Sequence, residues 1–371
     1  MKQILLVEPN YKTTWHPLGL MRISTYHKDM KDSVAFIKGE HKIDFVPDMI
    51  YVSTLFTYKL KETVRTIRYY RTEFPKAEII AGGVSATTLK FLIEKYNITV
   101  HQGLSKDFEN CAPDYSLFPD MDTSYTYTHR GCTRKCPFCV VPIIEPKFYN
   151  RDWLKDVNPK FKNLILMDNN WLAKDKESWL DDVRKLKDLC KNGNLRNIDW
   201  NQALDVRFCN EETFKHIKGL PIKPLRFSFD HMGQDGHIQR NLKLAKKYKF
   251  HNLRITTLYN WLDTVDDFYY RVKEIVRHGA TSIPMCYMPL GQDDKDYVGK
   301  YWTKKERDGV TKINPFKGQI STNNIEDFEF FFGKDAKEFR KLLNYNKLDE
   351  LTHLKQSKFK RMKVCRIKSN H

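Results

Sequence analysis

Apolar and polar positions alternate along the first hundred residues in a way that predicts strands and helices in turn. Short apolar runs at residues 2–9 (KQILLVEP), 47–56 (PDMIYVSTLF) and 77–83 (AEIIAGG) have the length and the bounds of buried strands, and residues 98–103 (ITVHQG) predict a further short strand. Between them, residues 58–75 (YKLKETVRTIRYYRTEFP) have a helical period and end in proline. Strands that alternate with helices predict a parallel sheet, so we expect residues 1–103 to form a Rossmann-like α/β domain.

A second α/β segment follows a short connector. Residues 104–123 carry prolines and acids without clear periodicity, which predicts a linker. From residue 124 alternation resumes, and six βα units predict a partial (β/α)6 barrel over residues 124–290. Residues 291–371 are mixed and are expected to form a C-terminal extension with a basic tail. The six strand candidates read SYTYTHR, NLILMDN, IDWNQAL, PLRFSFD, NLRITTLY and SIPMCYMPL.

Net charge narrows the classes of partner. The chain has a formal charge of +18, and residues 355–371 contain seven lysines and arginines without an acid. Such a segment attracts polyanions, so an RNA or DNA partner and a plain solvated tail both stay open. Tyr69, Tyr70 and Trp302 could stack on bases, although packing is the commoner role of such residues. No uncharged apolar run of about 18 residues and no signal peptide is present, so we expect a cytoplasmic protein without membrane contact.

The cysteines fall into two groups. Cys132, Cys136 and Cys139 stand in THRGCTRKCPFCVVP at C-x3-C-x2-C spacing, with no fourth cysteine nearby. The other five are scattered, so no disulfide framework is expected and the pattern fits a reducing compartment. These five are Cys111, Cys190, Cys209, Cys286 and Cys365, of which Cys286 is expected in a core strand.

Three thiolates hold a metal centre but leave one coordination position open. Structural zinc requires a closed tetrahedron, for which His129 could be the fourth ligand. A [4Fe–4S] cluster with three cysteines instead leaves one iron open to a small molecule. Both interpretations follow from the spacing alone.

The stretch GCTRKCPFC resembles the signature of the radical S-adenosylmethionine (SAM) superfamily, including the aromatic Phe138 before the last cysteine. The resemblance covers roughly residues 124–290. It implies that Cys132, Cys136 and Cys139 hold a [4Fe–4S] cluster and that SAM chelates the open iron. It further implies that a flavodoxin- or ferredoxin-like reductant supplies an electron, and that SAM is cleaved to methionine and a 5′-deoxyadenosyl radical that abstracts hydrogen from a substrate.

Further positions carry over from the resemblance along the later strands. After the second barrel strand, Asp168 and Asn169 in LILMDNNWL replace a glycine–glycine–glutamate motif and would meet the amino group of SAM, unless they only shape the turn. The third strand, WNQALDVRF, resembles a Q-G-L-D-x-R pattern and offers Gln202, Asp205 and Arg207 as pocket lining or as an ion pair.

The fourth barrel strand, PLRFSFDHM, places Arg226, Ser228 and Asp230 on one face by its period of two. Ser228 and Asp230 are candidates for contact with the ribose or carboxylate of SAM, or with the substrate. On the fifth strand, LRITTLYNWLDT departs from the glycine-rich adenine motif of the family.

The first domain resembles the cobalamin-binding domain of one radical SAM class. Ser53 and Leu55 match its S-x-L motif, and Gly82 and Gly83 match its glycine pair, for which a tight strand-to-helix turn is the simpler explanation. The D-x-H-x-x-G cobalt-ligand motif is missing after the first strand. Cobalamin is therefore a possible cofactor, but a degenerate domain used for packing or substrate docking is favoured.

The leading hypothesis is a radical SAM enzyme that abstracts hydrogen from an unassigned substrate, with nucleic acid or a nucleotide suggested by the charge. A cobalamin-dependent radical SAM methyltransferase is the alternative within the same class. A non-catalytic nucleic-acid-binding protein with a structural Fe–S cluster or zinc is the alternative outside it.

Overall fold

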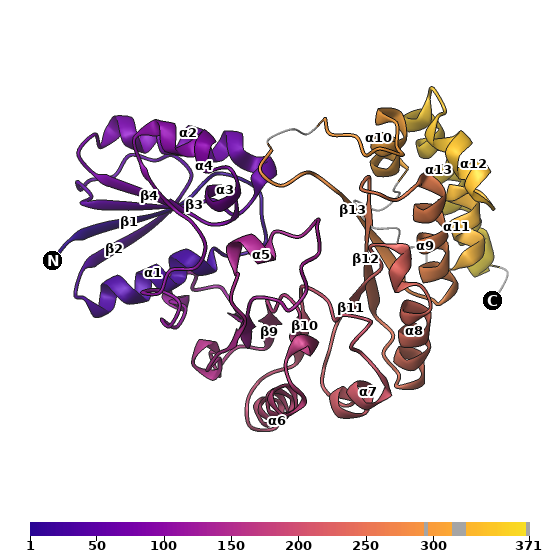
Figure 1. The fold of residues 1–371 in the computed structure, drawn as a ribbon, viewed down its shortest axis with the longest axis horizontal. Helices are drawn as coiled ribbons and strands as arrows, with labels where there is room; N and C mark the ends of the chain where they lie inside the picture. The colour runs from indigo at the N-terminus through magenta and orange to yellow at the C-terminus, as the bar shows by residue number, and fades with distance from the viewer. Residues whose placement is uncertain (293–295, 314–323, 369–371) are drawn as a thin grey trace. The chain divides into compact units, whose positions relative to one another are not determined.

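The computed structural model describes residues 1–292, 296–313 and 324–368, with side chains up to residue 359 (Figure 1). The chain divides into two compact units, each treated by itself. The first comprises Met1–Asn169, Lys191–Arg196 and Pro289–Lys295, and the second comprises Asn170–Cys190, Asn197–Met288 and Asp296–His371. The sequence pattern did not indicate a division at Asn169, and the predicted domain bounds at 103, 124 and 290 stay predictions.

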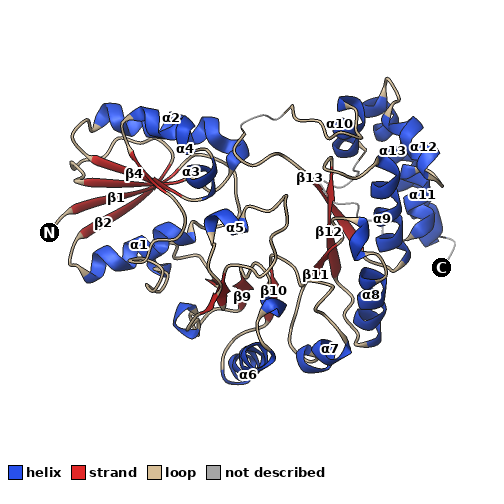
Figure 2. Cartoon of the chain, viewed as in Figure 1, coloured by secondary structure: helices blue, strands red, loops and turns tan. Residues whose placement is uncertain are grey.

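The first unit contains a five-stranded parallel sheet in the order β2-β1-β3-β4-β5. Figure 2 draws its strands as red arrows and labels β1, β2 and β4. Both faces of the sheet are covered: Leu5 and Val7 of β1 belong to one buried cluster, and Ile4 and Leu6 to another. This explains the unbroken apolar run at the start of the chain. The strands are β1 Gln3–Glu8, β2 Ser33–Lys38, β3 Met49–Ser53, β4 Glu78–Gly82 and β5 Thr99–His101. The helices are α1 Leu18–Asp29, α2 Leu60–Glu73, α3 Val84–Thr88 and α4 Lys90–Ile93.

Strand β2 was not predicted. It lies at the edge of the sheet, pairs only with β1, and none of its residues is fully buried. Its sequence, SVAFIK, has four apolar residues flanked by polar and charged ones, so it lacks the long apolar run of a central strand. The Rossmann-like prediction was right in type and one strand short.

The rest of the first unit carries the start of the predicted barrel. Strand β6 (Thr123–Thr126) pairs in parallel with β9 (Asn163–Leu166). The segment predicted as one strand, SYTYTHR, forms β6 and then β7 (His129–Arg130), which pairs antiparallel with β8 (Tyr149–Asn150). Helix α5 (Val141–Ile144) lies between β7 and β8 in the chain.

The second unit contains a parallel three-stranded sheet in the order β11-β12-β13. All six strands predicted for the barrel are therefore present: β6 and β9 in the first unit, and β10, β11, β12 and β13 in the second. This confirms the α/β class. The remaining elements are α6 Lys176–Asn192, β10 Asn197–Trp200, α7 Glu211–Ile217, β11 Leu225–Ser228, α8 His237–Lys247, β12 Leu253–Tyr259, α9 Val265–Arg277 and β13 Thr281–Cys286.

One expectation about β13 was wrong. Cys286 lies on this strand, as predicted, but it is the last residue of the strand and is exposed rather than part of the core. Burial falls along the strand from Ser282, which is fully buried, to the exposed Met285 and Cys286. The apolar sequence of the strand therefore overstates how far it lies inside the fold.

Four C-terminal helices complete the second unit and share an aromatic cluster with α9, whose members include Phe268, Trp302, Phe328 and Phe339. Their bounds are α10 Lys304–Lys312, α11 Ile325–Phe332, α12 Ala336–Leu343 and α13 Leu348–Lys368.

The basic tail predicted from residue 355 begins as part of this packed region. The Nζ atom of Lys355 donates to the backbone oxygens of Phe330 (2.9 Å) and Phe331 (3.1 Å), and Phe359 is buried. Its start is therefore not a solvated tail, and the side chains from residue 360 onward lie outside the described part of the chain.

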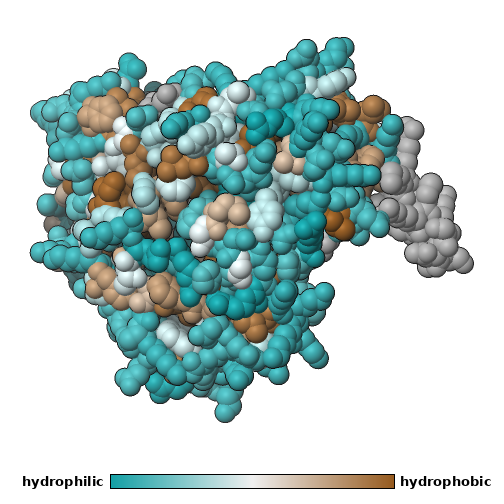
Figure 3. Space-filling model, turned by 45° about the vertical axis from the view of Figure 1, so that its right-hand side comes forward, coloured by the Kyte–Doolittle hydropathy of each residue, from teal (hydrophilic) through white to brown (hydrophobic). Residues whose placement is uncertain are grey.

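Two of the three aromatic residues considered for base stacking are core residues. Tyr70 is fully buried and Trp302 is 6% exposed. Neither can stack on a base, which leaves the packing explanation for both. Much of the face shown in Figure 3 is hydrophilic. None of the described helices has both the length and the apolar character needed to cross a membrane.

Candidate functional site

All three clustered cysteines lie on one loop, residues 131–148, which we call the cysteine loop. Its base is closed by the pairing of β7 with β8, where His129 lies opposite Asn150 and Arg130 opposite Tyr149. Cys132, Cys136 and Cys139 are partly exposed thiols outside any disulfide. The structure therefore places the three cysteines directly after the first strands of the predicted barrel, as the sequence indicated.

Gly131 closes the cysteine loop backbone against backbone. Its φ is +76°, and a Cβ atom added there would lie 2.3 Å from the backbone oxygen of Lys147. Any other residue would meet both the left-handed conformation and a fixed backbone atom. Glycine at this position thus allows the two ends of the loop to approach each other.

Hydrogen bonds within the cysteine loop shape its backbone. The backbone N–H of Arg134 donates to Sγ of Cys132 at 3.3 Å, and Cys139 N donates to the backbone oxygen of Cys136 at 3.0 Å. Arg134 and Lys135 place two basic residues between the first two cysteines. In number, spacing and exposure, the three thiols suit the ligands of an iron–sulfur cluster.

His129, considered as a fourth zinc ligand, is fully buried beside a carboxylate. Its Nδ1 lies 2.9 Å from Oδ1 of Asp168, and its ring lies 5.1 Å from that of Phe148, centroid to centroid. Neither ring nitrogen makes a hydrogen bond within the described part of the chain. Among the residues that the structure describes, no three His, Cys, Asp or Glu side chains are grouped to hold one metal ion, and this applies to the three cysteines of the loop as well as to His129. The structure thus lends no support to His129 as a zinc ligand.

Asp168 fastens the strand that enters the cysteine loop to the end of β9. Its Oδ1 accepts from Thr128 N (2.7 Å), Thr128 Oγ1 (3.0 Å) and His129 N (3.0 Å). Its Oδ2 is buried without a hydrogen bond to any described residue. The next residue, Asn169, donates its side-chain amide to Oε2 of Glu145 at 2.8 Å. Both residues lie at the carboxyl end of β9, and their predicted contact with SAM stays a prediction.

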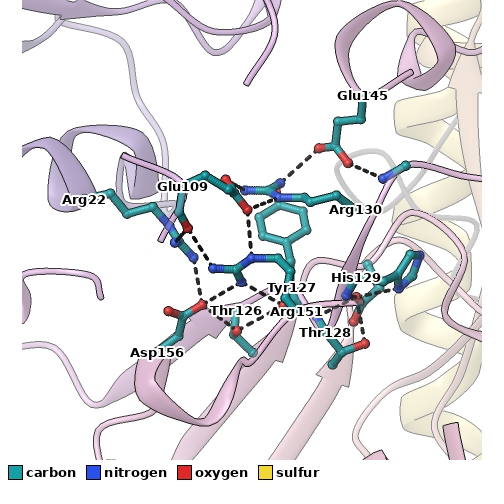
Figure 4. Close-up of polar contacts among 12 residues, drawn as sticks. Arg22, Glu109, Thr126, Tyr127, Thr128, His129, Arg130, Glu145, Arg151 and Asp156 are labelled. Carbon is teal, nitrogen blue, oxygen red and sulfur yellow. Dashed lines mark hydrogen bonds and ion pairs between the residues drawn. The ribbon is translucent and has the colours of Figure 1, made fainter. Parts of the chain in front are cut away.

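A buried network of three arginines and three carboxylates adjoins the start of the cysteine loop (Figure 4). The sequence analysis missed this network. At its centre, Arg130 donates two hydrogen bonds to Glu109, at 2.7 and 2.8 Å, and one to Glu145 at 3.0 Å. The Arg130 guanidinium also lies over the ring of Tyr127, with Cζ 3.4 Å from the centroid. Arg130 directly precedes Gly131, so this network fixes the start of the cysteine loop.

The other half of the network joins distant segments. Arg151 donates to Asp156 Oδ2 at 2.9 Å and to the Tyr127 backbone oxygen at 2.8 Å, and Arg22 donates to the same Asp156 oxygen at 2.7 Å. Burial alone would raise the pKa of Glu109, but its arginine neighbours outweigh burial and hold that pKa below its ordinary value. Burial disfavours the charge of Arg130, yet Tyr127 and the carboxylates raise its pKa overall.

The prediction that one strand of the second unit carries Gln202, Asp205 and Arg207 was wrong. Strand β10 ends at Trp200, and the chain turns at Ala203, whose φ is +72°. Gln202 is exposed in this turn. Asp205 and Arg207 form a two-bond ion pair at 2.7 and 2.7 Å. This pair is the alternative that the sequence left open, and a role toward a cofactor stays a prediction.

Ser228 and Asp230 meet at the carboxyl end of β11 through Gln234. The Gln234 amide donates to Ser228 Oγ at 3.4 Å and accepts from Asp230 N at 2.7 Å. Burial raises the pKa of Asp230, against the opposing effects of Ser228 and Arg271. Arg226, predicted on the same face of this strand, is paired with Asp199 at 2.6 and 2.7 Å. The predicted contacts of Ser228 and Asp230 with SAM or substrate stay predictions.

Comparison with known proteins assigns the fold. No protein-family model and no curated protein sequence matches the chain. Two solved structures of TsrM, a radical SAM methyltransferase from Kitasatospora setae, match at a TM-score of 0.62 and 12% identity. Each match covers 78% of this chain, and 73% or 75% of TsrM. One TsrM structure holds tryptophan substrate and the SAM analog aza-SAM, and the other holds cobalamin and a [4Fe–4S] cluster. The chain therefore has the fold of a radical SAM enzyme, which confirms the predicted fold class.

Proposed function

We propose that the protein is a radical SAM enzyme that holds a [4Fe–4S] cluster on Cys132, Cys136 and Cys139 and binds SAM beside it. The observation that carries this proposal is the place of the three thiols: one loop, closed at its base, after the first strands of a fold shared with TsrM. When bound, such a cluster supplies the electron that cleaves SAM, and the protein orients the reacting parts.

The chain's own residues would hold these groups as follows. The three thiolates would hold the cluster, with Arg134 and Lys135 offsetting its negative charge. Asp168 and Asn169 would supply acceptors near the amino group of SAM, because both lie at the end of β9, beside the start of the cysteine loop. Phe138 would pack near the cluster from within the loop.

The reaction would be hydrogen abstraction from an anionic substrate. The net charge of +18 favours a nucleotide or nucleic acid, and it also favours an acidic flavodoxin- or ferredoxin-like reductant. A reducing compartment such as the cytoplasm suits a site that needs three thiols.

A cobalamin-dependent methyl transfer is the second candidate, favoured by the fold shared with the cobalamin-bound TsrM structure. Against it, the glycine pair of the first domain is used in packing. Gly83 has a φ of +124°, a Cβ added there would lie 3.0 Å from the Thr54 backbone oxygen, and Thr54 N donates to Gly82 O at 2.9 Å. This is the tight turn that the sequence suggested, so hydrogen abstraction remains the favoured reaction.

Cluster assembly tests the proposal. After anaerobic reconstitution, the wild-type chain should carry the iron and sulfide of one [4Fe–4S] cluster, and alanine at Cys132, Cys136 or Cys139 should abolish it. Cys111→Ala is the matched control, because Cys111 is a partly exposed thiol of the same unit outside the loop. A full cluster in any of the three loop variants would refute the assignment of ligands.

A further inference from the structure

We propose that Glu145 is a positioning residue that orients the amide of Asn169 as the acceptor for the amino group of SAM. This inference rests on the proposed function. It concerns a residue outside the strand ends, at the end of α5 on the cysteine loop. Its evidence is the set of hydrogen bonds that converge on one buried carboxylate.

Glu145 is held on both oxygens. Oε1 accepts from Arg130 at 3.0 Å, and Oε2 accepts from Gly131 N at 2.8 Å and from the Asn169 amide at 2.8 Å. The residue is 8% exposed, and Arg130 offsets its charge. Charged hydrogen bonds of this kind are stronger than neutral ones, so the carboxylate forms a rigid anchor for the groups that it touches.

This anchor fixes which way the Asn169 amide faces. An ionised carboxylate only accepts hydrogen bonds, so the amide must present its NH2 group to Glu145. A flipped amide would set its carbonyl oxygen against a carboxylate oxygen. The carbonyl oxygen of Asn169 therefore points away from Glu145, where it can accept a hydrogen bond. An ammonium or amino group donates and needs such an acceptor.

The same carboxylate also fixes the start of the cysteine loop. Gly131, whose N–H binds Glu145, is the residue before Cys132. One side chain thus ties a predicted cluster ligand to the predicted acceptor at the end of β9. A molecule that binds the open iron through its amino group would meet both, which is why we assign Glu145 to the binding of SAM rather than to stability alone.

The test uses the reconstituted chain and measures SAM affinity by equilibrium binding, with cluster content and thermal unfolding recorded for each variant. In Glu145→Gln, the introduced amide no longer dictates the orientation of Asn169, and SAM should bind about 10-fold more weakly with the cluster retained. In Asn169→Ala the proposed acceptor is removed, and SAM should bind about 10-fold more weakly. Because Glu145 acts on SAM through the Asn169 amide, the double variant E145Q/N169A should bind SAM within about 3-fold of N169A. Glu78→Gln, an exposed site on β4, is the matched control.

Each outcome decides the matter. Wild-type affinity in E145Q, or a further loss of affinity from N169A to the double variant, would overturn the inference. So would loss of the cluster in E145Q, because the role of Glu145 would then be structural. If E145Q does not fold, Glu145→Asp, which keeps the charge beside Arg130 but is one methylene shorter, takes its place in the same comparisons. A wild-type chain that assembles no cluster would reject the proposed function first, and the inference with it.

Discussion

Replacing Glu109 by glutamine should destabilise the first unit strongly. The side chain of Glu109 is about nine-tenths buried and faces two arginines: Arg130 binds it twice, and Arg151 Nε lies 2.8 Å from its Oε1. Glutamine keeps the shape but removes the charge, and it turns an NH2 group toward a guanidinium. Arg130 and Arg151 would then be buried with one negative charge fewer to balance their own positive charges.

The magnitude follows from this geometry. Breaking a buried ion pair by removing one partner costs about 3–5 kcal/mol. Because glutamine keeps one acceptor oxygen, we expect the lower end, a loss of about 3 kcal/mol in the free energy of unfolding. With a urea dependence of about 2 kcal/mol per molar, the unfolding midpoint would fall by about 1.5 M.

Urea unfolding followed by circular dichroism measures this shift, with Glu78→Gln as the control. Glu78 is exposed on β4 of the same unit, so its variant should stay within about 0.5 kcal/mol of wild type. If E109Q unfolded together with this control, the arginine–carboxylate network would not contribute to stability, and the reasoning from its distances would be wrong.

The pH dependence gives the same prediction an independent check. The pKa of Glu109 is lower in the folded state than in the unfolded chain, since Arg130 and its neighbours outweigh burial. Its contribution is therefore fully present above the unfolded value of about 4.3 and is lost as the pH falls through the lower folded value. The stability difference between wild type and E109Q should shrink over that acidic range. A difference that grew on acidification would contradict the assigned direction.

Two further predictions concern backbone conformation. Gly131→Ala should prevent cluster assembly, because the added Cβ atom would lie 2.3 Å from the Lys147 backbone oxygen. The control is Gly219→Ala, which should keep the cluster because Gly219 also has a positive φ but has open space around it. Equal iron content in the two variants would contradict the steric argument. Ala203→Gly should raise the free energy of unfolding by about 0.5–1 kcal/mol, because Ala203 has a φ of +72°. The control is Ala245→Gly, inside α8, which should lower the free energy of unfolding by about 1 kcal/mol or more. If the urea midpoints of the two alanine-to-glycine variants moved in the same direction, the argument from backbone conformation would be refuted.

The fold was largely predictable because its strands and helices leave strong local periodicities. β1, with Leu5 and Val7 on one face and Ile4 and Leu6 on the other, is buried on both sides and reads as an apolar run. The edge strand β2 leaves no such run, and it was missed. Cys286 shows the opposite failure, since an apolar strand sequence does not tell where along the strand burial ends.

The candidate site was predictable only in its local part. Cys132, Cys136 and Cys139 lie within eight residues, so their spacing alone indicates a metal centre. The network beneath them joins residues that are far apart in the chain: Arg130 and Glu109 are separated by 21 positions, and Arg22 and Asp156 by 134. No pattern in one sequence marks such pairs, because their meeting depends on the whole fold.

The central claim is tested most directly by SAM cleavage. The reconstituted protein is reduced without oxygen, given SAM, and analysed for 5′-deoxyadenosine and S-adenosylhomocysteine, with Cys136→Ala as the control. The account predicts 5′-deoxyadenosine from the wild type and none from the variant, and S-adenosylhomocysteine in its place would favour methyl transfer. A wild-type chain that carries an intact cluster and binds SAM, but releases neither product under reduction, would contradict it.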